Sequence, residues 1–431
     1  MRRLDWTQLD DSERRAALAR PELRADRALQ DGVSAIVEQV RDGGWEALCE
    51  IARTLDGEEP RLVAVAPIAA EARRSLPAEQ VAAMELAADN IQRFHEASMP
   101  SDVALETVPG LSVRKLWRPI ERVGLYVPGG KTPLFSTLLM LAIPAAVAGV
   151  REIVAVTPPR PEGGLDPLVA LAAQLSRMQA LWTVGGAQAV AALAFGASQI
   201  PRVDKICGPG NAWVAEAKRL VGSMPAGPAI DMPAGPSELM VIADDSSQAA
   251  VVAADLLGQA EHDAAAQVIL VSPSERLLDD VERAINGQVQ DLPRSAIVTG
   301  SLSSARLILV RNLEQAVDVA NLYAPEHLSL AVAAADKLVP LVCNAGAVFA
   351  GSLAAETFGD YLAGSSHVLP TDGAAKAWSG VSPYTYLKSM SVQTVSPAAA
   401  RMIAQPAALL ARMEGLEAHA RAADVRLGKV A

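Results

Sequence analysis

The stretch that decides the fold runs from residue 122 to residue 157 and reads RVGLYVPGGKTPLFSTLLMLAIPAAVAGVREIVAVT. It holds two short apolar runs rich in β-branched residues, 123–127 and 152–156, and Pro or Gly closes each run. The same texture continues downstream, with candidate strands at 181–184 and 205–207 and alanine-rich candidate helices at 167–177 and 187–194. Strands and helices that alternate at this spacing predict a parallel α/β layer.

The same alternation restarts after Pro236. Candidate strands lie at 239–242, 267–271, 296–299 and 307–310, and candidate helices lie at 247–262 and 313–322. The sequence therefore predicts an α/β fold of two Rossmann-like parallel-sheet domains, the first inserted within the second.

Both ends of the chain are predicted to be helical extensions. Residues 31–54 and 77–97 carry apolar residues at spacings of three and four, and residues 397–427 have a helical pattern with a break near Glu414-Gly415. We therefore expect four parts: an N-terminal extension over 1–20, an α/β domain built from 21–110 and 237–381, an inserted Rossmann-like domain over 111–236, and a helical tail over 382–431.

Length and composition are typical of a globular enzyme. The chain has 431 residues, of which 51% are hydrophobic and 20% charged, so it can form two or three buried cores. Its formal net charge of -11 argues against nucleic-acid binding, which needs a clustered positive face, and against docking on anionic membranes. The longest apolar run, 138–150, is too short to span a bilayer and is interrupted by Pro144.

The N-terminal sequence and the cysteines favour the cytoplasm. Two arginines follow Met1 without an apolar stretch behind them, so no secretory signal is expected. Cys49, Cys207 and Cys343 lie far apart and form no Cys-x-x-Cys pair, which argues against a disulfide framework and against a thiolate zinc site.

Histidine is scarce, and four of the five histidines lie in contexts that suggest chemistry. Gln259 and His262 lie three residues apart at the end of a predicted helix, so both can point at one centre. Imidazole is a common zinc ligand, and an amide oxygen is a weaker one. For this pair alone, a histidine that interacts with the helix dipole is the favoured alternative.

Two other segments combine a carboxylate with an imidazole. Glu326 and His327 follow a predicted helix directly, and these are the two commonest types of general base. A glycine-rich loop contains Asp360 and His367, and His419 lies on a helix of the tail. A turn or a solvated surface would explain each segment alone, whereas Asp, two His and Gln from four places would suit zinc.

Eight short strings, taken together, closely resemble the histidinol dehydrogenase family from about residue 20 to the C-terminus. In chain order they are GGAQA (185–189), GPGNA (208–212), AGPSE (234–238), QAEH (259–262), PEH (325–327), GDY (359–361), HVLPT (367–371) and EGLEAH (414–419). No string is decisive alone, but eight in this order are highly specific. The sequence departs from the family at Ser366, where asparagine usually precedes the histidine, and this affects the shape of the substrate pocket rather than the chemistry.

The resemblance implies a role for each of these residues. Zinc would be held by Gln259, His262, Asp360 and His419, and these ligands would also contact the substrate. The acid/base pair would be Glu326 and His327, further substrate contacts would be Ser237, His327, His367 and Glu414, and NAD contacts would be Tyr126, Gln188 and Asn211. The resemblance also implies a homodimer with shared active sites, in which Glu414 and His419 reach the partner's site. A tail too short to form its own core is compatible with such an exchange.

The domain over 111–236 lacks the usual nucleotide fingerprint. No Gly-x-Gly-x-x-Gly follows a predicted strand, so its assignment as the NAD-binding domain rests on the resemblance. Pro128-Gly129-Gly130 and Gly185-Gly186 offer close backbone approach and a helix N-terminus to a pyrophosphate.

The reaction that the resemblance implies is the oxidation of L-histidinol to L-histidine through L-histidinal, in two NAD-linked steps. His327 would remove the hydroxyl proton and Glu326 would activate water. The alternatives are a relative in the same family that oxidises another small alcohol such as a sulfonated diol, an aldehyde dehydrogenase with Cys207 as nucleophile, and a zinc hydrolase. Glu414 and the string around His419 favour histidinol, and a small buried residue at a strand end is the favoured interpretation of Cys207.

Overall fold

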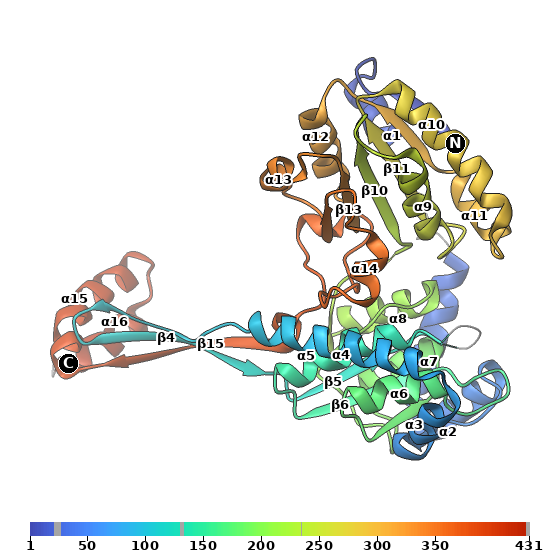
Figure 1. Ribbon diagram of the computed structural model, residues 1–431. Coiled ribbons are helices and arrows are strands. Elements are labelled where there is room, and N and C mark those ends of the chain that lie inside the picture. The colour runs from blue at the N-terminus through green and yellow to red at the C-terminus, as the bar shows by residue number, and fades with distance from the viewer. Residues whose placement is uncertain (21–26, 130–132, 234, 428–431) are drawn as a thin grey trace. The chain divides into compact units, whose positions relative to one another are not determined.

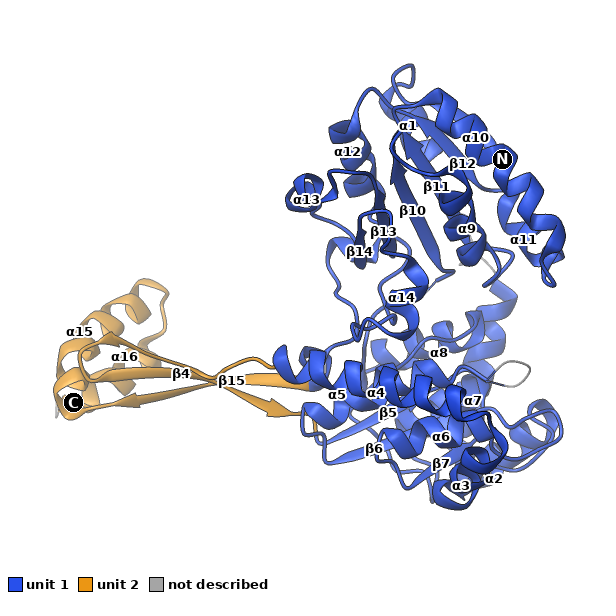
Figure 2. Ribbon diagram, viewed as in Figure 1, with its two compact units in different colours: residues 1–98, 121–386 blue, residues 99–120, 387–431 orange. Residues whose placement is uncertain are grey.

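The computed structural model describes residues 1–20, 27–129, 133–233 and 235–427, which fall into two compact units (Figures 1 and 2). Unit 1 comprises Met1–Ser98 and Glu121–Tyr386, and unit 2 comprises Met99–Ile120 and Leu387–Ala431. Unit 1 contains two six-stranded sheets, and unit 2 contains a three-stranded sheet. The predicted α/β fold with parallel sheets is confirmed.

The first sheet of unit 1 has the order β2-β7-β6-β5-β8-β9. Its strands are β2 (Arg61–Ala64), β5 (Arg122–Tyr126), β6 (Glu152–Thr157), β7 (Ala180–Thr183), β8 (Lys205–Cys207) and β9 (Ala229–Ile230). Only β2 is antiparallel to its neighbour among these strands, and the parallel strands, counted from β5 along the chain, lie in the order 3-2-1-4-5. The helices between them are α5 (Phe135–Val147), α6 (Pro167–Leu175), α7 (Gly186–Phe195) and α8 (Ala212–Ser223).

Three N-terminal helices pack on this first sheet, not on the second: α2 (Arg27–Leu55), α3 (Val65–Ser75) and α4 (Ala78–Ala97). The α2 helix packs against α7 and α8, α3 packs against α6, and α4 packs against α5. Val33, Val37 and Val40 of α2 enter the core of this sheet. The structure thus groups 27–97 with 122–230, whereas we had expected them beside 237–381. Periodicity identifies a buried helix face but not the surface that covers it.

The second sheet has the order β1-β12-β11-β10-β13-β14, and all its pairs are parallel. Its strands are β1 (Arg2–Asp5), β10 (Glu238–Ala243), β11 (Gln267–Ser272), β12 (Arg306–Leu309), β13 (His327–Ala331) and β14 (Ala347–Ala350). Counted from β10, its strands again lie in the order 3-2-1-4-5, with β1 added at one edge. Its helices are α1 (Asp11–Ala17), α9 (Ala249–Ala260), α10 (Glu275–Gln288), α11 (Ser295–Leu302), α12 (Leu313–Tyr323), α13 (Ala335–Leu338) and α14 (Glu356–Tyr361).

Two segments of this second sheet's domain have a different structure from the one we expected. Residues 1–20 do not form a separate extension, because β1 pairs with β12 and Trp6, Ala17 and Leu18 are buried in the sheet's core. Residues 296–299 were expected to form a strand but belong to the helix α11. A four-residue apolar run cannot be told from a helical segment by periodicity alone.

Unit 2 combines an antiparallel sheet with two helices. Its strands β3 (Val103–Val108), β4 (Leu111–Pro119) and β15 (Leu387–Val395) have the order β15-β4-β3. The helices α15 (Pro397–Met413) and α16 (Glu417–Val425) pack on each other, and the predicted break lies at Gly415, whose φ is 76°. The tail is therefore helical only from Pro397 onward, because Leu387–Val395 pairs with β4, a partner more than 250 residues away in sequence that no local pattern identifies.

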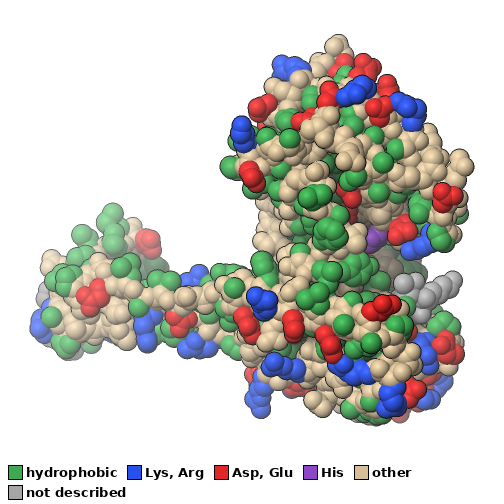
Figure 3. All heavy atoms as spheres, viewed as in Figure 1, with side chains coloured by type: hydrophobic (Ala, Val, Ile, Leu, Met, Phe, Trp, Pro, Cys, Tyr) green, Lys and Arg blue, Asp and Glu red, His purple; other side chains and the backbone are tan. Residues whose placement is uncertain are grey.

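Charged side chains of both signs lie on the visible surface. On the face drawn in Figure 3, acidic and basic side chains of the described residues are interspersed, and they form no continuous basic patch there. None of the described helices combines the length and the apolarity that crossing a bilayer requires.

Candidate active site

The predicted acid/base pair lies where β10 and β13 begin. His327 is the first residue of β13 and Glu326 directly precedes it, while Glu238 is the first residue of β10. Because the two strands are neighbours, with Leu239 opposite His327, these side chains meet at the amino edge of the second sheet. Open α/β sheets usually bind ligands at the carboxyl edge, so topology alone would have placed the site at the opposite edge.

The hydrogen bonding of His327 leaves one ring nitrogen available as a base. Its Nδ1 lies 3.1 Å from the backbone oxygen of Glu238. A carbonyl oxygen can only accept, so Nδ1 carries the proton and donates it. The other nitrogen, Nε2, is buried and has no hydrogen-bond partner among the described residues. Burial lowers the pKa of His327 to about 3, which keeps the ring neutral and Nε2 unprotonated.

Three carboxyl groups surround this ring. Nδ1 lies 3.6 Å from Oε2 of Glu326 and 3.5 Å from Oε1 of Glu356, and Nε2 lies 4.0 Å from Oδ1 of Asp360. Burial raises the pKa of Glu326 and of Glu356 well above the ordinary value, and that of Asp360 to about 6. Within the described part of the chain, none of the three forms an ion pair with Lys or Arg. Buried carboxyl groups without such a counter-charge favour a bound cation.

Donor atoms of His327, Glu356 and Asp360 lie within 4.8 Å of one another, so the cluster can hold a metal ion. This set shares only Asp360 with the four predicted zinc ligands. Glu356 was not predicted from the sequence, although a signal was present: it lies four residues before Asp360, on the same face of α14.

One face of α9 turns toward this cluster. Asp255 adds to the raised pKa of Glu356, and the charge of His262 adds to the lowered pKa of His327. Gln259 lies on α9 after Asp255, three residues before His262, which follows the helix. It is buried, and neither atom of its amide has a partner among the described residues. Asp255 was also missed, although it shares a helix face with Gln259 four residues later. The α9 face therefore offers an unused amide beside the carboxyl groups.

His367 and Ser237 lie at the border of the cluster. The Nδ1 atom of His367 lies 2.8 Å from the backbone oxygen of Asp360, and its Nε2 lies 3.5 Å from Oγ1 of Thr137. The charge of His262 also lowers the pKa of His367, after the larger effect of burial. Ser237 is half-buried directly before β10, and its backbone oxygen accepts from Gln267.

The two predicted site residues of the tail belong to unit 2. Glu414 directly follows α15 as its C-cap, and His419 lies in the first turn of α16. Both side chains are exposed, so neither has a structural role within the hydrophobic core of its unit.

The predicted NAD contacts lie at the carboxyl edge of the first sheet. Tyr126 ends β5, Gln188 is in the first turn of α7 after β7, and Asn211 precedes α8 after β8. Asn211 is exposed, and its side-chain oxygen accepts from the backbone of Trp213 and of Val214, each at 3.1 Å, as a helix N-cap.

The glycine pair at the start of α7 is not free to bind a pyrophosphate, contrary to our expectation. The Gly185 amide donates to Asp56 at 3.0 Å, and the Gly186 amide donates to the Tyr126 hydroxyl at 3.1 Å. Gln188 donates to the same Asp56 carboxylate at 3.1 Å. Side chains therefore satisfy the amides that a phosphate would need. Of the other glycine turn, Gly130 lies outside the described residues.

Cys207 is fully buried on β8. Burial raises the pKa of its thiol far above the ordinary value, so it is not a thiolate at neutral pH. The thiol mechanism with Cys207 as nucleophile is therefore not supported by its surroundings.

Fold and site define an α/β enzyme with two sheets of the same strand order and a buried imidazole–carboxyl cluster at one sheet edge. The chain belongs to the histidinol dehydrogenase family, whose model matches residues 18–427, and it is thus an oxidoreductase acting on a CH–OH group. It is 46% identical to the histidinol dehydrogenase of Xylella fastidiosa over 433 residues, with all of both chains covered. It is 43% identical to that of Mannheimia succiniciproducens over 431 residues, again with full coverage of both.

Solved structures agree with this family. The crystal structure of histidinol dehydrogenase from Elizabethkingia anophelis matches with a TM-score of 0.94 and 37% identity, covering 99% of this chain and 98% of that one. An acetylating aldehyde dehydrogenase from Geobacillus thermoglucosidasius matches with a TM-score of 0.50 and 14% identity, covering 87% and 99%. This second likeness concerns the fold alone.

Proposed function

We propose that the enzyme oxidises L-histidinol to L-histidine through L-histidinal, using two NAD and one zinc ion, as the last steps of histidine biosynthesis. The observation that carries this proposal is the hydrogen bond from Nδ1 of His327 to the Glu238 carbonyl, which leaves Nε2 without a partner among the described residues at the edge of the carboxyl cluster. This is the state that a general base needs in order to accept the proton of an alcohol.

The residues present fit a zinc ion. The unused amide of Gln259, the imidazole of His262 and the carboxyl group of Asp360 are N and O donors of the kind zinc accepts. His419 of the partner subunit would supply the fourth donor. His327 stays outside this set, because Nε2 cannot bind a metal and accept a proton at once. Bound zinc would hold the amine and imidazole nitrogens of the substrate and thereby orient its alcohol carbon.

Each oxidation divides the work between two side chains of this chain. In the first, His327 accepts the hydroxyl proton at Nε2 while the carbon loses a hydride, and the aldehyde results. In the second, Glu326 accepts a proton from water, whose oxygen adds to the aldehyde, and the resulting gem-diolate loses the second hydride to give the acid. Bound NAD would supply the hydride acceptor of each oxidation. Ser237, His367 and the partner's Glu414 would hold the substrate.

The NAD contacts would be Tyr126, Gln188 and Asn211 at the carboxyl edge of the first sheet. Their position after parallel strands, near the β5/β8 switch in strand order, supports this assignment. The pyrophosphate would have to lie away from the amides of Gly185 and Gly186, which Asp56 and Tyr126 occupy.

The test is NADH formation with L-histidinol, measured with and without a chelator and after zinc is restored. Two NADH per L-histidinol and recovery with zinc are expected; no NADH from L-histidinol, with turnover of another alcohol in a panel, would contradict the substrate. The matched variant is His262→Asn, which should lose both zinc, measured by metal analysis, and turnover. Full zinc occupancy in that variant would remove His262 from the ligand set.

The shared site is tested by complementation between two inactive variants. His419→Asn and His262→Asn proteins, unfolded and reassembled together, should form heterodimers in which one site carries both lesions and the other carries none. Up to half of the wild-type activity per heterodimer should return. Confirmed heterodimers without activity would place His419 in its own chain's site.

A further inference from the structure

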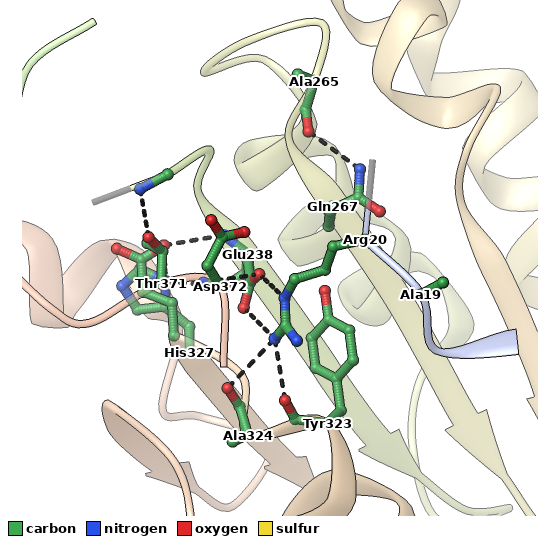
Figure 4. Close-up of polar contacts among 12 residues, drawn as sticks. Ala19, Arg20, Glu238, Ala265, Gln267, Tyr323, Ala324, His327, Thr371 and Asp372 are labelled. Carbon is green, nitrogen blue, oxygen red and sulfur yellow. Dashed lines mark hydrogen bonds and ion pairs between the residues drawn. The ribbon is translucent and has the colours of Figure 1, made fainter. Parts of the chain in front are cut away.

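An ion pair between Arg20 and the buried Glu238 lies next to the His327 base (Figure 4). The guanidinium of Arg20 binds the carboxylate of Glu238 through two atoms: Nε donates to Oε1, and an Nη donates to Oε2 at 2.9 Å. Glu238 is 1% exposed, so its charge depends on this partner. The backbone oxygen of the same Glu238 accepts the proton of His327 Nδ1. One residue thus joins the ion pair to the tautomer of the base.

Arg20 also holds the turn that leads into His327. The same Nη donates to the backbone oxygen of Tyr323 at 3.0 Å and to that of Ala324 at 3.4 Å (Figure 4). The guanidinium carbon lies 3.7 Å from the centre of the Tyr323 ring. Ala324 has a φ of 56°, a left-handed conformation that a residue with a side chain adopts only when its surroundings enforce it.

Arg20 itself is fixed by the N-terminal segment. Arg306 donates to the backbone oxygen of Ala19 at 2.5 Å, and β1 and α1 anchor the residues before it on the second sheet. The guanidinium therefore approaches β10 and the α12–β13 turn from a firmly placed backbone. It contacts Glu238 at the start of β10 and the Tyr323 and Ala324 carbonyls of the turn before β13.

We propose that Arg20 is a positioning residue for catalysis: it holds the Glu238 carbonyl and the 323–326 turn so that His327 keeps its proton on Nδ1 and presents Nε2 to the substrate. This rests on the proposed function only in assigning His327 as the base. Arg20 touches neither substrate nor cofactor in this assignment. A planar guanidinium suits the role, because it can bind a carboxylate and two carbonyl groups at once.

The test compares Arg20→Gln with the wild-type zinc enzyme by kinetics and by ¹⁵N NMR of labelled histidine. With five histidines in the chain, the ring signals of His327 can be assigned by their loss in His327→Asn. We expect kcat to fall about ten- to a hundredfold with little change in KM for L-histidinol or in zinc content. The ¹⁵N signals of His327 should change from a pure Nδ1–H tautomer to a mixture.

Controls separate positioning from folding. Arg3→Gln removes an exposed ion pair with Asp279 from the same segment and should keep kcat and the tautomer. Arg20→Lys keeps the charge but not the planar guanidinium, so its kcat and its His327 tautomer should be intermediate between those of the wild type and Arg20→Gln. If Arg20→Gln does not fold, the comparison of Arg20→Lys with the wild type is the test. Wild-type kcat, or an unchanged His327 tautomer, in either folded Arg20 variant would overturn the proposal. Absence of L-histidinol turnover in the wild type would instead contradict the proposed function, while the NMR comparison still judges Arg20.

Discussion

The two sheets of unit 1 share one strand order but gather their polar residues at opposite edges. When five parallel strands of each sheet are numbered along the chain, from β5 in the first sheet and from β10 in the second, they lie across the sheet in the order 3-2-1-4-5. In the first sheet, Tyr126 is the last residue of a strand, and Gln188 and Asn211 follow the carboxyl ends of two others. In the second, Glu238 and His327 stand where strands begin. Strand order therefore does not decide which edge carries the chemistry.

The difference lies in what reaches each edge. The C-terminal end of α9 and the helix α14 bring an amide, imidazoles and carboxyl groups to the amino edge of the second sheet. At the carboxyl edge of the first sheet, helix N-termini are capped by side chains, as Asp56 and Tyr126 show at α7. Among the described residues, the first of these edges keeps unpartnered atoms, namely His327 Nε2 and the Gln259 amide, which suits catalysis. At the other edge the backbone amides of Gly185 and Gly186 are already paired, which suits a shaped surface.

The largest expected effect belongs to the second sheet. His327→Asn keeps an N–H that can donate to the Glu238 carbonyl but removes the free ring nitrogen. Oxidation of L-histidinol should fall about 10²- to 10⁴-fold in kcat, since general-base catalysis contributes that much. Zinc content, measured by metal analysis, should stay at the wild-type level. Lost zinc would make His327 a ligand and return the choice to the set of His327, Glu356 and Asp360.

Glu326→Gln should separate the two oxidations. The amide oxygen can still accept from the Glu238 backbone amide, now 2.9 Å from Glu326 Oε2, so the local structure should survive. Oxidation of L-histidinal should slow about tenfold or more, and oxidation of L-histidinol less, because only the second step needs water to lose a proton. Single-turnover rates with each substrate measure this. Equal, mild effects on both steps would contradict the division of work.

His95, which is buried on a helix that packs on the first sheet, should affect stability rather than turnover. Burial lowers the pKa of His95, on α4, from 6.5 to about 4. Because the pKa of His95 is depressed in the folded state, protonation of this residue does not lower the free energy of unfolding above pH 6.5. As the pH falls toward 4, this free energy should decrease by about 3 kcal/mol. Urea unfolding over this range should show a smaller loss for His95→Leu than for the wild type. Parallel curves would show that His95 does not titrate there.

Tyr126→Phe tests the paired edge of the first sheet. The change removes the acceptor of the Gly186 amide, and one such hydrogen bond at a cofactor site is worth a factor of about five. KM for NAD should rise by about that factor while KM for L-histidinol stays unchanged. The reverse pattern would mean that Tyr126 serves the substrate and that the NAD site lies elsewhere.

The smallest effect is expected at Cys207. Its thiol is buried and protonated, so Cys207→Ser should keep activity within about twofold and should cost only some stability. Complete loss of activity in a folded variant would favour the thiol mechanism and would move the chemistry to the first sheet.

Local sequence patterns determined the α/β class, most strands of both sheets, the break at Gly415 and the residue types of the site. Those features depend on periodicity, on turn residues and on side-chain chemistry, and each of these signals comes from residues that are close together in the sequence. The strings around Gln259, His327 and Asp360 were enough to indicate the family.

Only the tertiary structure decided which helices, strands and side chains contact one another. It assigned α2 to the first sheet, joined β1 to the second, paired β15 with β4, and brought Glu356 and Arg20 to the surroundings of His327. Arg20 and Glu238 are 218 residues apart, and Glu356 and Asp360 form an ordinary helical pair until the fold encloses them. Which surface covers a helix face, and which charge neutralises a buried carboxylate, depend on long-range packing that no local pattern records.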